Sequence, residues 1–140
     1  MGGEPIITSN PLIFSSLFFL TNALVAFLKK YYLYALFFLV LTITSLIFHS
    51  NNNVYTNLID KIAILLVIIY GGYLLFQKMC AKHAFTCFMI ILTFFLVVYL
   101  YIYGYTNKMY CFSEDSYISG AYHSILHLLS SLGHHLIIIL

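Results

Sequence analysis

The chain has 140 residues, of which 63% are hydrophobic and only 7% are charged. Soluble proteins carry about 25% charged residues, so this composition excludes a soluble globular protein and indicates an integral membrane protein. The formal net charge of +2 comes from six lysines and four acidic residues. Nucleic-acid binding needs a dense basic patch, which this sequence lacks. Three cysteines, an odd number, argue against a full disulfide framework.

Five segments of the chain are mostly apolar over about the 20 residues that a membrane-spanning helix needs. They are residues 11–28, 31–49, 58–76, 84–103 and 117–140. The first is opened by Ser9, Asn10 and Pro11, residue types typical of a helix start. The last is the most polar of the five. We therefore predict an all-α fold, in which residues 1–140 form one integral membrane bundle of about five transmembrane helices.

The charges between the predicted spans indicate how the chain is oriented. One side of the membrane receives four lysines and no acidic residue: Lys29, Lys30, Lys78 and Lys82. The other side receives Glu4, Asp60, Lys61, Lys108, Glu114 and Asp115. Lysine-rich loops face the cytosol in most membrane proteins. We expect a multi-pass protein, with an endomembrane location favoured, whose N-terminus is lumenal or extracellular and whose C-terminus is cytosolic.

Polar side chains within the predicted spans gather on one side of the membrane. Ser45 and His49 lie four residues apart at the end of the second span, and Asp60 lies at the start of the third. His123 and His127, again four apart, lie in the fifth span. Residues four apart share one face of a helix. Because ionisable groups inside a membrane are costly, each is a candidate functional residue.

Three histidines in this group match the ligand set of a metal site. His123 and His127 can both reach one metal ion from a single helix face, and His49 would supply a third nitrogen. Three protein ligands and an open fourth position are typical of catalytic zinc, which lowers the pKa of bound water to about 7. Asp60 could accept a proton from that water, and Ser45 could donate to a developing oxyanion. The sequence therefore predicts zinc held by three histidines, with two catalytic residues beside it.

The other two histidines of the last span are expected outside this site. His134 lies eleven residues after His123, about 16 Å further along a helix. His135 follows it directly. We expect both to have structural or interfacial roles towards the cytosolic side. The adjacent Gly71 and Gly72 are expected to permit close packing of helices.

The arrangement of these residues resembles a known family. Ser45, His49 and Asp60, followed by the phrase HSILHLLSSLG that contains His123 and His127, is similar to the CREST superfamily of membrane hydrolases. Its members include the alkaline ceramidases and the progestin and adiponectin receptors. The resemblance implies a zinc ion on the three histidines, water activated by Asp60, assistance from Ser45, and a lipid amide substrate such as ceramide. Family members typically have seven spans, so five indicate a shortened member.

Two other functions are compatible with the same pattern. The protein could be non-catalytic and use a zinc ion to hold the bundle together, in which case Asp60→Asn would be harmless. It could also be a small channel, in which case polar residues should follow a pore along its whole length. The polar residues of the predicted site instead gather at one depth, which disfavours the channel.

Overall fold

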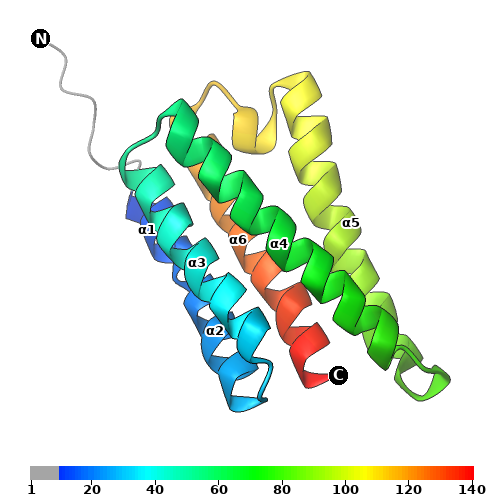
Figure 1. Cartoon of the computed structure of the whole chain (residues 1–140). Helices are drawn as coiled ribbons and strands as arrows, with labels where there is room; N and C mark the ends of the chain where they lie inside the picture. The colour runs from blue at the N-terminus through cyan, green and yellow to red at the C-terminus, as the bar shows by residue number, and fades with distance from the viewer. Residues whose placement is uncertain (1–9) are drawn as a thin grey trace, which may run out of the picture.

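The computed structural model describes residues 10–140, and this part of the chain is built from helices. The α-helices are α1 (Asn10–Ser16), α2 (Phe18–Leu28), α3 (Tyr32–Ser50), α4 (Val54–Lys78), α5 (Ala84–Asn107) and α6 (Ser116–Ile139). Two short 3-10 turns, η2 (Ala81–His83) and η3 (Tyr110–Phe112), precede and follow α5. Figure 1 shows the long helices side by side in a bundle. The predicted all-α fold is confirmed.

Four helical segments are long and apolar enough to cross a membrane: Pro11–Leu28, Tyr32–Ser50, Val54–Lys78 and Ala81–Phe112. They correspond to the first four predicted spans. The fifth span forms α6, which is as long as α5 at 24 residues but carries four histidines that lower its hydropathy. It packs against α1, α2, α4 and α5. The most polar helix of the bundle thus packs against four others, while one of its faces, with Leu128 and Leu132, stays exposed.

The first predicted span is not one continuous helix. It is divided at Leu17, where the backbone makes two tight turns, from Leu17 N to Phe14 O and from Leu20 N to Leu17 O, each 3.1 Å. The hydroxyls of Ser15 and Ser16 compete with the helical backbone hydrogen bonds, because both donate to the carbonyl of Leu12, at 3.1 and 2.8 Å. Serine side chains that bond to their own backbone in this way bend helices. Ser9, expected at the helix start, lies outside the described residues.

The links between the helices lie at two opposite ends of the bundle. The α3–α4 link lies near the α5–α6 link, and the α2–α3 and α4–α5 links lie at the opposite end with the end of α6 (Figure 1).

The third and fourth predicted spans, residues 58–76 and 84–103, form the longer helices α4 and α5. Asn53 begins α4 four residues earlier, through a reciprocal pair of hydrogen bonds with Thr56. Glu4, which contributed to the predicted orientation, lies outside the described residues.

The hydrophobic core lies where α2, α3, α4 and the end of α6 meet. Its most deeply buried side chains include Tyr34, Phe38, Val67 and Ile138, each at most 2% exposed. The outer faces of the helices carry many exposed leucine, isoleucine and phenylalanine side chains. This is the surface expected of a bundle whose surroundings are lipid, because lipid does not penalise apolar side chains.

Candidate metal centre

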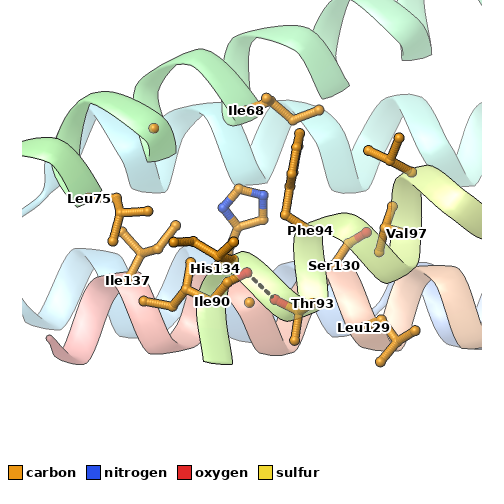
Figure 2. Close-up of a pocket in the computed structure, with 14 residues that line it drawn as sticks. Ile68, Leu75, Ile90, Thr93, Phe94, Val97, Leu129, Ser130, His134 and Ile137 are labelled. Carbon is orange, nitrogen blue, oxygen red and sulfur yellow. Dashed lines mark hydrogen bonds between the residues drawn. The ribbon is translucent and has the colours of Figure 1, made fainter. Parts of the chain in front are cut away.

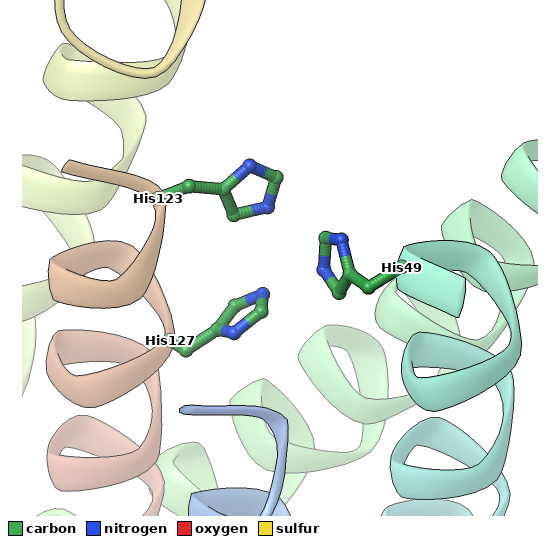
Figure 3. Close-up of side chains that lie close together, drawn as sticks. All are labelled: His49, His123 and His127. Atoms are coloured by element: carbon green, nitrogen blue, oxygen red, sulfur yellow. The ribbon is translucent and has the colours of Figure 1, made fainter. Parts of the chain in front are cut away.

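Three histidine rings meet between α3 and α6. His49 comes from the last turn of α3, and His123 and His127 come from successive turns of α6. The centroids of His49 and His123 are 4.9 Å apart, those of His49 and His127 are 5.2 Å apart, and those of His123 and His127 are 4.9 Å apart. The rings therefore form a nearly equilateral triangle and point toward a common centre (Figure 3).

The nitrogen atoms of this triangle could hold a metal ion. One nitrogen from each ring lies within 4.8 Å of the others. A tetrahedral zinc ion with bonds near 2.1 Å holds its ligands about 3.4 Å apart, so the rings would move together by up to about 1.4 Å. His49 Nε2 is buried and has no hydrogen-bond partner among residues 10–140. A buried polar atom without a partner is costly, and an ion would remove that cost.

The orientation of His127 is fixed by α1. Its Nδ1 atom lies 2.8 Å from the hydroxyl of Ser15. If that hydroxyl donates its single hydrogen to Leu12 O, 3.1 Å away, it accepts from His127 Nδ1. The hydrogen of the neutral ring is then on Nδ1, which leaves Nε2 as the free nitrogen. Ligating histidines in metalloproteins commonly donate their second ring nitrogen to such a partner. Phe19 packs edge-on against the same ring, with centroids 5.2 Å apart.

Asp60 lies in the second turn of α4 and is only 4% exposed. Thr44 donates to its Oδ1 atom at 3.1 Å. An exposed carboxylate at a helix start would be an ordinary surface feature, but a buried carboxylate needs a partner. The burial of Asp60 therefore favours a specific role. Lys61, the next residue, lies over the rings of Phe48 and Tyr101 at 5.8 and 5.4 Å.

Ser45 is 1% exposed, and its hydroxyl lies 2.8 Å from that of Ser16. Ser16 donates its hydrogen to Leu12 O at 2.8 Å, so Ser45 is the donor in the pair of serines. The hydrogen of Ser45 thus has a partner within the protein. To donate to an oxyanion, Ser45 would have to release Ser16.

A cavity of about 310 Å³ connects the predicted site residues. Its walls include Ser45, Asp60, Lys61, His123 and His127. The remaining walls are mainly apolar. The structure thus places the two predicted catalytic residues and two of the three predicted ligands around one space, and His49 completes the triangle beside it. Ser15, Ser16 and Thr44 were not predicted, although the serine pair is conspicuous within the apolar phrase LIFSSLFF.

A second group of polar side chains lies in the other half of the bundle. His135 Nδ1 lies 2.7 Å from Asn22 Nδ2, and Ser131 donates to Asn22 Oδ1 at 2.5 Å. His134 bonds through Nδ1 to the hydroxyl of Tyr34. His134 and His135 thus lie outside the histidine cluster, as predicted, and buried polar groups occur at more than one depth of the bundle.

These observations describe a helical membrane protein with a buried cluster of three histidines that could bind a metal ion. Comparisons with known protein families, with curated proteins and with solved structures found no match for the chain. The resemblance to the CREST superfamily stays a prediction from the sequence.

Proposed function

We propose that the protein is a zinc-dependent hydrolase that cleaves a lipid amide within the membrane. The observation that carries this proposal is the convergence of His49, His123 and His127 beside a cavity that also contains Asp60 and Ser45. Three imidazole nitrogens suit zinc and leave a fourth position open. When bound, zinc would lower the pKa of a coordinated water to about 7 and supply a nucleophile.

The protein side chains have distinct roles in this proposal. Ser15 orients His127 by accepting from Nδ1, and Thr44 holds one oxygen of Asp60. The other oxygen of Asp60 would accept the proton from the attacking water and later deliver it to the leaving amine. Ser45 would exchange its bond to Ser16 for one to the substrate carbonyl oxygen, and such a donor stabilises the developing charge.

The cavity supports a lipid as the substrate. Beyond its polar end, its walls are formed by apolar side chains of α4, α5 and α6, including Ile64, Val67, Val97 and Val98. An acyl chain would remove this surface from water or lipid without needing polar partners. The choice of an amide, with ceramide as the first candidate, follows from the resemblance to the alkaline ceramidases. The orientation of the chain predicted above places this site in the lumenal or extracellular half of the membrane.

The test combines metal content with turnover. The purified protein is expected to retain about one zinc per chain, and to release fatty acid from a fluorescent ceramide. His123→Ala and His127→Ala should lose both properties, whereas His83→Ala, in η2 at the other end of the bundle, should keep both. Intact protein that retains no zinc and hydrolyses no lipid amide would contradict the proposal.

A structural zinc site is the second candidate, because the cluster joins α3 to α6 and is tied through Ser15 to α1. Asp60→Asn distinguishes the two functions. For a hydrolase, this variant should bind zinc normally and lose turnover by a factor of about 100 or more. For a structural site, zinc binding and thermal stability would be unchanged and the wild-type protein would not cleave the lipid.

A further inference from the structure

A second cavity lies between α4, α5 and α6, in the half of the bundle away from the histidine cluster. Its volume is about 300 Å³. The side chains around it are mostly apolar, including Leu75, Ile90, Phe94 and Ile137. Figure 2 shows Thr93, Ser130 and the ring of His134 among them. Phe94, one of the lining residues, has a side chain that is 49% exposed. Part of the cavity wall therefore belongs to the exposed face of α5.

His134 presents a hydrogen-bond donor to this cavity. Its Nδ1 atom bonds to the hydroxyl of Tyr34, which is fully buried and bonds to no other described residue. A buried hydroxyl must donate its hydrogen to avoid a large penalty, and Nδ1 is the acceptor it contacts. In the neutral ring the hydrogen is then on Nε2. Nε2 bonds to no other residue within 10–140, so it is available to a ligand.

Two adjacent glycines of α4 keep this arrangement open. A Cβ atom on Gly71 would lie 2.5 Å from the Tyr34 hydroxyl and 2.9 Å from His134 Nδ1. A Cβ atom on Gly72, which lines the cavity, would meet nothing within 4 Å. Gly71 therefore makes room for the Tyr34–His134 pair, and Gly72 leaves the cavity beside that pair unfilled. The predicted role of both glycines in close helix packing applies to Gly71 only.

We propose that this cavity binds a neutral lipid alcohol, with its hydroxyl oxygen accepting from His134 Nε2 and its apolar body against α4 and α5. The chemistry of the cavity walls favours this class of ligand. An apolar body matches most of the walls, and a hydroxyl group matches the two polar groups available there, His134 Nε2 as a donor and the Ser130 hydroxyl, which also lines the cavity. A carboxylate would need a cationic partner to be buried. Lys78, on α4, is not such a partner, because it donates to Ile137 O and Ile138 O at 2.8 and 3.1 Å.

The site is distinct from the histidine cluster but adjoins its cavity. Both cavities share Ile68, Val97, Val98, Ser130 and His134 as lining residues. His134 lies seven residues after His127, about 10 Å along α6. The proposal does not depend on hydrolysis or on a metal ion. An experiment must distinguish a ligand in this cavity from one at the histidine cluster.

The test uses a long-chain alcohol with a photoreactive diazirine in its chain and the full-length protein in nanodiscs. Labelling is mapped by mass spectrometry and is expected on cavity residues of α4 and α5. Unlabelled 1-hexadecanol should compete at least about fivefold more effectively than hexadecane, which is the effect of one neutral hydrogen bond. It should also compete better than palmitate.

Variants of the protein test the position of the ligand. His134→Leu should weaken binding about fivefold, and Gly72→Leu should abolish labelling by filling the cavity. Ile69→Phe, which adds bulk at an exposed position of the same helix, should label normally. Gly72→Leu leaves the Tyr34–His134 pair intact and so remains informative if His134→Leu does not fold.

Three results would overturn the proposal. Labelling that persists in Gly72→Leu would place the ligand elsewhere, and labelling lost in His123→Ala would place it at the histidine cluster. Stronger competition by palmitate than by 1-hexadecanol would exclude a neutral head group. Because no turnover is measured, these results are independent of whether the protein hydrolyses a lipid amide.

Discussion

The ring of His127 is oriented by a hydroxyl that lies 112 residues earlier in the chain. Spacing within α6 shows that His123 and His127 share a face, and the predicted spans place His49 on the same side of the membrane, at the end of the second span. Neither observation shows which helix packs behind His127. The bond to Ser15 depends on the rotation of α1 about its own axis, which is determined by packing and by the break at Leu17. The three candidate ligands could therefore be predicted from the sequence, whereas the residue that orients one of them could not.

Ser15→Ala should weaken metal binding without abolishing it. Loss of the acceptor leaves Nδ1 of His127 unpartnered and frees the ring to rotate, and such changes typically reduce metal affinity by about 10 to 100-fold. Zinc affinity, measured by competition with a chelator, should fall by that factor. Ser124→Ala, between the two histidines on α6 but outside the cluster, is the matched control and should bind zinc as the wild type does. Equal affinity in both variants would show that Ser15 does not orient His127.

Helix α4 combines a capped start with a glycine pair near its other end, and these features have different origins. The cap follows from local chemistry: Asn53 accepts from Thr56 N at 3.0 Å, and Thr56 Oγ1 accepts from Asn53 N at 3.1 Å. This start was predicted four residues too late, because the apolar pattern begins only at Leu58. The glycine pair could be read from the sequence, but its two different surroundings could not, since they depend on the side chains of α3 and α6.

Asn53→Ala should destabilise the bundle by about 1 kcal/mol, the usual effect of removing a helix N-cap. The backbone N–H of Thr56 would lose its side-chain partner, and the turn that leads to Asp60 would fray. The expected result is a lower thermal midpoint in detergent. Asn52→Ala, one residue earlier in the same exposed link, should leave the midpoint unchanged. A similar decrease in both variants would indicate an effect of the link rather than of the cap.

Gly71→Ala and Gly72→Ala should differ in their effect on stability. Both changes improve helix propensity by up to about 1 kcal/mol. At Gly71 the new methyl group would collide with Tyr34 and His134, and overpacking of this kind costs about 1 to 3 kcal/mol. Thermal unfolding should therefore show a decrease for Gly71→Ala and no decrease for Gly72→Ala. Equal midpoints would mean that the Tyr34–His134 pair moves aside without cost.

At the scale of the whole molecule, hydropathy predicted the number of long helices but not their relation to one another. Apolar length alone identifies the first four spans. The fifth is tolerated as a polar helix because α1, α2, α4 and α5 pack around it, so its histidines and serines face protein rather than lipid. The same packing brings the Lys29–Lys30 link and the link with Lys78 and Lys82 to one end of the bundle (Figure 1). The lysine bias therefore belongs to a single face of the molecule.

That face is predicted to be cytosolic. Labelling of native Cys80 measures this orientation directly, because Cys80 is exposed in the α4–α5 link, whereas Cys87 and Cys111 are buried. In sealed vesicles with the cytosolic face outward, a membrane-impermeant maleimide should label Cys80 without detergent. In a Cys80→Ser background, Asn52→Cys at the other end of α4 should be labelled only after detergent is added. The 25 residues of α4 extend about 37 Å, which exceeds the hydrocarbon thickness of about 30 Å. The reverse pattern would invert the orientation and place the histidine cluster in the cytosolic half, whereas labelling of both sites without detergent would show that α4 does not cross the membrane.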